Sequence, residues 1–286
     1  MRLSEILLSI CRPFVKLANH RKRVRYREAN IPDVVAVLAI MKNESYNVKE
    51  WIEHYLWQGA QQIYLIDNGS DDNTLEVIQP WINSGQVKVL VRNEKWQQEK
   101  HYWTAIRHFK IQQSCRWLVV ADLDEFWFCK DGRTLSDALS SYLRYDVIYA
   151  NWTMFGSGGW NKHPDSLRLR LTEKDPKLGP NDFTKFICRA RVLSTSLSLA
   201  VHKVFGACSS KSISDNEAFQ INHYSIQSRE YYENVKMARG DAHDARNESI
   251  RDWTSFEKYN RPCVVEDRQL ADMLIARNAQ SGTRKP

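Results

Sequence analysis

Residues 116–124 read RWLVVADLD, a run of apolar side chains that ends in two carboxylates. Uninterrupted apolar and β-branched residues are typical of a strand buried on both faces, as in parallel sheets. We therefore expect a buried strand that ends at Asp122 and Asp124. Open α/β sheets bind ligands at the carboxyl ends of their strands, where two carboxylates suit a divalent metal. The alternative is a pair of solvated carboxylates at a strand end.

Upstream of this strand, strand-like runs alternate with helical patterns. In chain order these segments are 34–40, 48–56, 63–66, 74–81, 87–91 and 97–113. The alternation predicts a parallel sheet with right-handed crossovers. Three polar loops then meet at one edge of the sheet, formed by Asn43 and Glu44, by residues 67–72 and by residues 122–125. Further along, we expect a helix over 134–145, a strand over 147–150 and a short helix over 269–276.

The net charge of +7 is concentrated at the N-terminus. Residues 1–30 carry eight Lys and Arg and two Glu, a balance of +6. The remainder is nearly neutral, which does not indicate a nucleic-acid partner. Apolar residues recur at helical spacing over 3–17, a stretch too short to span a bilayer. We expect either an amphipathic helix over residues 1–28 that lies in a membrane interface, or a helix packed on the main domain followed by a basic linker.

Several motifs together resemble the family 2-like and family 92-like (DUF23-type) glycosyltransferases, which are GT-A enzymes. They are, in order, Lys42 to Glu44, Glu50 to Tyr55, Gly59, Ile63 to Asp72, Asp122 to Phe126, Trp152 to Gly159 and Ile221 to Ser225. The resemblance implies an α/β fold with a GT-A-like, Rossmann-like and mostly parallel central sheet flanked by helices. We expect this domain over residues 31–265. It would follow a basic arm over 1–30 and precede a short helix and disordered tail over 266–286.

The resemblance implies transfer of a sugar from a nucleotide-sugar donor to an acceptor hydroxyl on a glycan or a lipid-linked glycan, with inversion. Mn²⁺ or Mg²⁺ would neutralise the departing diphosphate, with Asp122, Asp124 and His223 as its ligands. The catalytic candidates are Asp124, Glu125 and, as general base, Asp182, with Glu173 and Asp175 in the same part of the chain. The donor-binding candidates are Asn43, Glu44, Asp67, Asn68, Asp122 and Lys203.

An aromatic and glycine-rich segment follows the strand expected over 147–150. Glycine lets the backbone approach a ligand closely, and aromatic rings suit the apolar faces of sugars. We interpret Trp152, Phe155, Gly156 and Gly159 as an acceptor-side loop. The alternative is a flexible turn with core aromatics.

Two other classes of function stay open. A nucleotidyltransferase also uses a carboxylate pair and a metal, but residues 42–45 lack the glycine-rich loop that such enzymes show after the first strand. A non-catalytic sugar-binding or nucleotide-binding protein would keep the fold and lose the dependence on metal.

The six cysteines contain no Cys-x-x-Cys pair, which favours a reducing compartment. We expect a cytoplasmic protein, or one peripheral to the inner face of the cytoplasmic membrane, that takes part in polysaccharide or lipopolysaccharide biosynthesis.

Overall fold

A nine-stranded mixed sheet forms the centre of the computed structural model, which describes residues 31–95, 97–177, 183–238 and 251–282. Its strands are β1 (Val35–Met41), β2 (Gln62–Asp67), β3 (Val87–Val91), β4 (Trp117–Val120), β5 (Glu125–Cys129), β6 (Val147–Met154), β8 (Thr184–Arg189), β9 (Ser212–Ser214) and β10 (Phe219–His223). The order across the sheet is β3-β2-β1-β4-β8-β6-β10-β5, and β9 pairs with β6. A two-stranded sheet joins β7 (Glu173–Lys174) to β11 (Val265–Glu266).

The two halves of the sheet differ in direction. Strands β3, β2, β1 and β4 all run parallel, as the alternating pattern predicted. Strand β8 is antiparallel to both β4 and β6, and β5 is antiparallel to β10. The α/β class is confirmed, with the parallel part concentrated in the first half of the chain.

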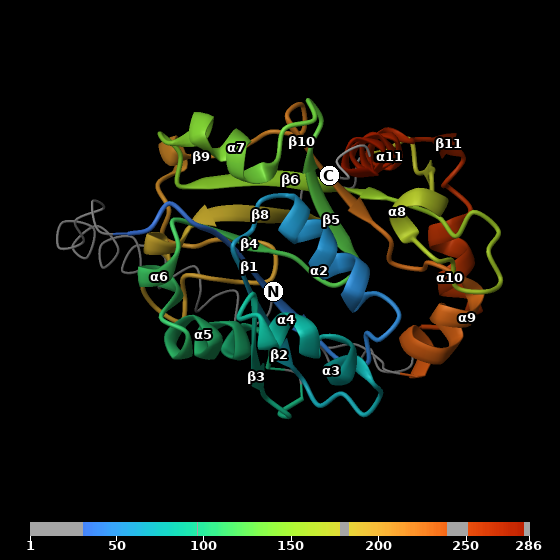
Figure 1. The fold of residues 1–286 in the computed structure, drawn as a ribbon, viewed down its shortest axis with the longest axis horizontal. Coiled ribbons are helices and arrows are strands. Elements are labelled where there is room, and N and C mark those ends of the chain that lie inside the picture. Colours follow the sequence, from blue (N-terminus) through green and yellow to red (C-terminus); the bar gives the residue numbers. More distant parts are fainter. Residues whose placement is uncertain (1–30, 96, 178–182, 239–250, 283–286) are drawn as a thin grey trace, which may run out of the picture.

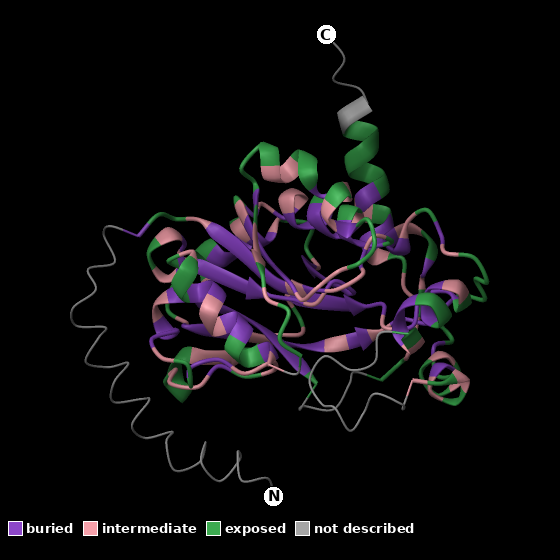
Figure 2. Cartoon of the chain, turned by 90° about the horizontal axis from the view of Figure 1, so that it is seen from below, coloured by how far each residue is buried: buried purple, intermediate pink, exposed green. Residues whose placement is uncertain are grey.

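Helices cover both faces of the sheet (Figure 1). They are α2 (Val48–Trp57), α3 (Thr74–Val77), α4 (Gln79–Asn83), α5 (Gln98–His108), α6 (Ile111–Ser114), α7 (Leu135–Leu139), α8 (Leu167–Arg170), α9 (Arg229–Tyr231), α10 (Trp253–Asn260) and α11 (Gln269–Gly282). Alternate residues of β1 point to opposite faces: Val37 packs with α2 and Leu38 with α5. Buried strands therefore lie between helices whose outer faces are exposed (Figure 2).

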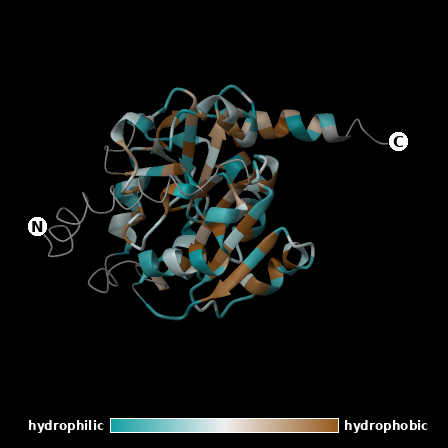
Figure 3. Cartoon of the chain, turned by 90° about the vertical axis from the view of Figure 1, so that its left-hand side faces the viewer, coloured by the Kyte–Doolittle hydropathy of each residue, from teal (hydrophilic) through white to brown (hydrophobic). Residues whose placement is uncertain are grey.

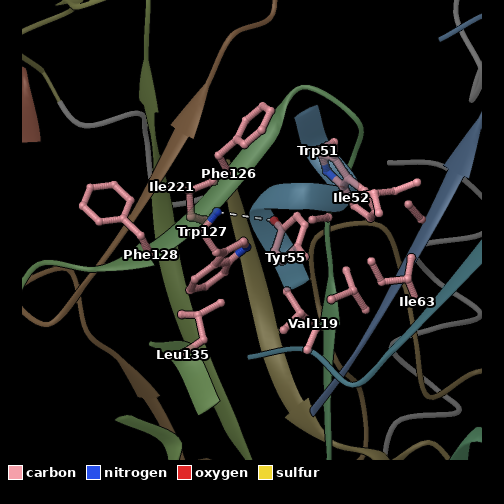
Figure 4. Close-up of a cluster of buried hydrophobic side chains, with 14 of the residues drawn as sticks. Trp51, Ile52, Tyr55, Ile63, Val119, Phe126, Trp127, Phe128, Leu135 and Ile221 are labelled. Carbon is pink, nitrogen blue, oxygen red and sulfur yellow. Dashed lines mark hydrogen bonds between the residues drawn. The ribbon is translucent and has the colours of Figure 1, made fainter. Parts of the chain in front are cut away.

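Helix α2 is held against β5 by packing and by hydrogen bonds. Trp51, Ile52 and Tyr55 recur at helical spacing and are completely buried. The Tyr55 hydroxyl donates to the backbone oxygen of Glu125 at 2.9 Å and accepts from the Trp127 N–H at 3.3 Å (Figure 4). This contact fixes the start of β5, and with it the acidic residues that precede the strand.

Some elements differ from expectation. The helix expected over 97–113 is divided at Lys110, whose φ of 53° is incompatible with a continuous right-handed helix. The helix expected over 134–145 is regular only over Leu135–Leu139 and continues as a 3₁₀ turn, Ser140–Tyr142. Helix α11 runs to Gly282 rather than ending near Ala276, and its far end projects from the body (Figure 2).

Hydrophobic residues are concentrated in the strands, and hydrophilic ones on the surrounding helices and loops (Figure 3). Among the described residues, no helix combines the length and the apolar character needed to cross a bilayer. The basic arm over residues 1–30 lies outside the described residues, so both interpretations of it stay predictions.

Candidate active site

The acidic pair lies in a tight turn between β4 and β5. The Glu125 N–H donates to the backbone oxygen of Asp122 at 3.0 Å, which closes the turn. The Glu125 carboxylate in return accepts from the Asp122 N–H at 2.9 Å. The indole of Trp51 donates to the same Asp122 backbone oxygen at 2.8 Å. We call residues 122–125 the acidic turn. Its backbone is held rigidly by the turn itself and by α2.

Lys185 lies completely buried beneath the acidic turn. This lysine comes from the middle of the sheet, on β8, where it stands between the buried residues Thr184 and Phe186. Its ammonium nitrogen is 2.8 Å from a carboxylate oxygen of Asp122 and 3.5 Å from one of Glu125. A buried ammonium ion is tolerated only when it is paired. Lys185 therefore joins two of the three acidic side chains.

Asp124 faces a different lysine and a histidine. The ammonium nitrogen of Lys236, from the π-helical turn Tyr232–Met237, is 2.6 Å from one of its carboxylate oxygens. The Nε2 atom of His223, at the end of β10, is 3.5 Å from the other. The predicted pairing of Asp124 with His223 is thus present. Ligand atoms of Asp124, Glu125 and His223 all lie within 4.8 Å of one another, whereas the carboxylate of Asp122 lies outside this group and binds Lys185.

The three carboxyl groups of the acidic turn have different proton affinities. Burial opposes ionisation of Asp124, but Lys236 and His223 outweigh it and hold the pKa of Asp124 well below its usual range. Burial also opposes ionisation of Asp122, and Lys185 lowers its pKa. Burial raises the pKa of Glu125 well above its usual range; Lys185 opposes this shift and the charges of Asp122 and Asp124 reinforce it. The turn therefore holds two carboxyl groups whose ionisation is favoured beside a third, Glu125, whose ionisation burial disfavours.

The loops after β1 and β2 are joined to each other by neutral hydrogen bonds. Asn43 exchanges side-chain and backbone bonds with Asp71, and Glu44 donates its N–H to Thr74 at 2.8 Å. Asp67 accepts from the N–H and hydroxyl of Ser70. The remaining donor-binding candidate of these loops, Asn68, donates to the backbone oxygens of Arg92 and Glu94. Each of these residues has a structural role, and their contact with a donor stays a prediction.

The four acceptor-side candidates have different surroundings. Trp152 lies at the site, with its ring 4.2 Å from His223 and stacked on Phe183. Phe155 is buried in the main core. A Cβ atom on Gly156 would lie 2.7 Å from that of Cys263, so packing requires this glycine. Gly159 has a φ of +75° and an open environment. An acceptor role for these residues stays a prediction.

No contact of the candidate bases with the acidic turn is seen among the described residues. Asp182 lies outside the described residues. Asp175 accepts from the Lys177 N–H at 2.9 Å, and Glu173 is exposed on β7. Lys203 is exposed and follows His202 in the chain.

A family model described as glycosyltransferase family 92 matches residues 34–263 of this chain. The chain belongs to glycosyltransferase family 92. This result confirms the family indicated by the sequence motifs. The matched region contains β1 to β10, so it includes all residues of the acidic turn and the lysines that face it.

Curated members of family 92 are distant relatives of this chain. A family 92 protein of Oryza sativa subsp. japonica is 26% identical over 260 residues, which cover 88% of this chain and 43% of that protein. One of Arabidopsis thaliana is 21% identical over 296 residues, covering 90% of this chain and 49% of that protein. The chain thus spans about half the length of the curated relatives it matches.

Solved structures give weaker likenesses. The S. aureus TarS 1–349 complex with UDP-GlcNAc has a TM-score of 0.43 and 16% identity, covering 80% of this chain and 72% of that one. GalNAc-T7 with UDP, GalNAc and Mn²⁺ has a TM-score of 0.42 and 12% identity, covering 91% of this chain and 59% of that one.

The sequence did not indicate that Lys236 pairs with Asp124, nor that Lys185 pairs with Asp122. Lys236 comes from a segment with no strand or motif signal, and only the fold brings it to Asp124. The position of Lys185 directly before the apolar residues Phe186, Ile187 and Cys188 was a usable signal, because a lysine in a buried strand must find a buried partner.

Proposed function

We propose that this family 92 domain transfers a sugar from a nucleotide-sugar donor to an acceptor hydroxyl, with a divalent metal at the acidic turn. The observation that carries the proposal is the cluster of the half-buried Asp122 with the buried Asp124 and Glu125 at the carboxyl end of β4, opposed by Lys185 and Lys236. Family membership supports the reaction class. The cluster would hold a divalent cation, whose positive charge a diphosphate leaving group requires.

The donor set of the acidic turn fits a divalent cation. Asp124, Glu125 and His223 offer two oxygens and one imidazole nitrogen, a combination that suits Mn²⁺. The Oε1 atom of Glu125 is completely buried and accepts no hydrogen bond from the described residues, and the Lys185 ammonium nitrogen lies 3.5 Å away. A buried carboxylate oxygen without a hydrogen bond suits a site where a cation belongs. When bound, the metal would neutralise charge on the departing diphosphate.

The chain's own residues would prepare the displacement. Lys185 keeps Asp122 ionised and fixed, and the turn backbone holds Asp124 toward His223. Lys236, whose ammonium nitrogen is 2.6 Å from the Asp124 carboxylate, would add positive charge beside the diphosphate of the donor. Direct attack of the acceptor oxygen on the anomeric carbon, opposite the diphosphate, would invert that carbon.

A glycan or a lipid-linked glycan is our proposed acceptor, at the inner face of the cytoplasmic membrane. The support is the sequence of residues 1–28, where an apolar stripe and a net positive charge coincide. Interfacial helices gain from apolar burial and from anionic lipid together. Co-sedimentation with anionic vesicles at low salt, lost on deletion of residues 1–28 while activity on a soluble acceptor persists, is the expected result. Equal binding by the deleted form would exclude the arm as an anchor.

The reaction is tested with a panel of sugar nucleotides, scored for nucleotide release with Mn²⁺, with Mg²⁺ and with a chelator. We expect release from at least one donor with metal, and none with chelator. Full nucleotide release in excess chelator would refute the dependence on a metal, but it would leave the proposed transferase activity in place. Nucleotide binding without release from any donor, over a range of acceptors, would instead favour the non-catalytic alternative.

A further inference from the structure

His202 lies beside the acidic turn with one ring nitrogen engaged and the other open. Its Nδ1 atom is 3.0 Å from the backbone oxygen of Thr184. Because a carbonyl oxygen only accepts, Nδ1 carries the proton, and Nε2 of the neutral ring keeps a lone pair. Within the part of the chain that the structure describes, no group hydrogen-bonds to Nε2. The half-buried ring therefore offers a proton acceptor of fixed orientation.

The position of His202 places this acceptor next to the reacting centre. Its ring centroid is 5.2 Å from that of Trp152, in an edge-to-face arrangement. The Trp152 ring is in turn 4.2 Å from His223, whose Nε2 is 3.5 Å from Asp124. One aromatic ring thus separates His202 from the group of candidate metal ligands. Phe183 stacks on the same Trp152 ring and is 46% exposed, which leaves an open apolar surface for a sugar.

The charges around His202 favour its neutral form. Burial is the largest influence and lowers its pKa from the ordinary value, and the ammonium group of Lys185 lowers it further. The hydrogen bond to Thr184 and the Asp122 carboxylate act in the opposite direction, and His223 adds a small lowering. The net effect is a lowered pKa, so the imidazole is neutral at pH 7 and able to accept a proton.

We propose that His202 is the general base that takes the proton of the acceptor hydroxyl, an inference that rests on the proposed function. As the acceptor oxygen forms its bond to the anomeric carbon, its proton moves to Nε2. The electron pair of the bond between that carbon and the phosphate oxygen leaves with the diphosphate. The imidazolium then returns its proton to water, which restores the neutral ring. This base differs from the carboxylates that the sequence indicated: Glu173 is exposed, Asp175 accepts from the Lys177 N–H, and Asp182 lies outside the described residues.

The test compares wild type with His202→Asn, using the donor identified by the panel and a soluble acceptor. The Asn side chain keeps an N–H in the place of Nδ1 for Thr184, but has no atom equivalent to Nε2. We expect kcat to fall on the order of 10²–10⁴-fold, with unchanged donor affinity by calorimetry and an unchanged melting temperature. His108→Asn, which alters an exposed histidine on α5, is the matched control and should keep full activity.

Two further readouts separate a base from a structural residue. Wild-type kcat/KM should fall as the pH drops below the lowered pKa of His202, that is below about 6.5, and this acidic limb should be absent in His202→Asn. Added imidazole should restore part of the activity of His202→Ala and none of that of Asp124→Asn. Activity of His202→Asn within about threefold of wild type, or an equal loss of donor affinity, would overturn the assignment. A wild-type chain that transfers no sugar from any donor would overturn the proposed function and the base together.

Discussion

Two acidic loops lie at the same edge of the sheet, and they satisfy their carboxylates in opposite ways. After β2, Asp67 and Asp72 accept hydrogen bonds from hydroxyl and backbone N–H groups of nearby residues. After β4, Asp122 and Asp124 instead face the ammonium groups of Lys185 and Lys236. Among the described residues, no ion pair involves Asp67, Asp71 or Asp72.

The difference separates a structural loop from a reactive one. Hydrogen bonds from neutral donors hold Asp67 and Asp72 in a fixed loop conformation. Buried ion pairs are costly to desolvate and contribute weakly to stability, so their presence calls for another explanation. We infer that the acidic turn is maintained for binding and chemistry, and the loop after β2 for the shape of the sheet edge.

The largest expected effect is on stability, from Lys185→Met. This change leaves Asp122 and Glu125 without their buried cation, and loss of one member of a buried ion pair costs about 3–5 kcal/mol. Chemical denaturation should show a decrease of this size in the free energy of unfolding. Lys162→Met is the matched control, because Lys162 pairs with Glu230 at the same 2.8 Å but is fully exposed. Equal, small effects of the two changes would show that the buried ion pairs of the acidic turn stabilise the fold no more than an exposed pair does.

Asp124→Asn should have the next largest effect, on activity. It keeps the shape of the side chain but removes a charge from the proposed metal site, so transfer should fall by at least about 10²-fold, equivalent to roughly 2.7 kcal/mol in the barrier. Asp72→Asn, in the other loop, should keep transfer near the wild-type rate. Nucleotide-release assays on both variants, with circular dichroism to confirm folding, provide the measurement. Comparable activity of Asp124→Asn and wild type would refute the role of the turn.

Asp67→Ala tests whether the loop after β2 also contacts the donor. If it does, nucleotide affinity should weaken by roughly 1–3 kcal/mol, the scale for hydrogen bonds to a charged group. Calorimetry measures this affinity directly. If Asp67 only holds Ser70, the melting temperature should fall while the nucleotide affinity stays the same.

The smallest expected effects are on the pH dependence of stability, which should have opposite signs for the two loops. Partial burial opposes ionisation of Asp72, but hydrogen bonds from Thr74 and Ser45 lower its pKa, so its contribution to stability is present above about pH 4 and is lost as the pH falls further. Glu125 has a raised pKa, so stability should decline as the pH rises above about 4.3, because only the folded state then keeps the proton. With chelator present, Glu125→Gln should make the free energy of unfolding less dependent on pH near neutrality. Asp72→Asn should reduce this pH dependence only in the acidic range. Identical profiles for the two variants would contradict these signs.

The parallel half of the fold was predictable because strand-like, mostly apolar runs are separated along the chain by segments with helical spacing. Strand β5 was not recognised, since it follows the carboxylates directly and pairs with β10 from much later in the chain. The centre of the site was predictable from Asp122 and Asp124. The cation opposite Asp124 was not, because Lys236 is 112 positions away and is placed there only by tertiary packing.

Binding of Mn²⁺, followed by electron paramagnetic resonance in the presence of the nucleoside diphosphate of the active donor, tests the central claim most directly. We expect wild type and Asp72→Asn to bind the ion alike, and Asp124→Asn to bind it at least about tenfold more weakly. Equal affinity of Asp124→Asn and wild type, or a loss confined to Asp72→Asn, would contradict the assignment of the metal–donor site to the acidic turn.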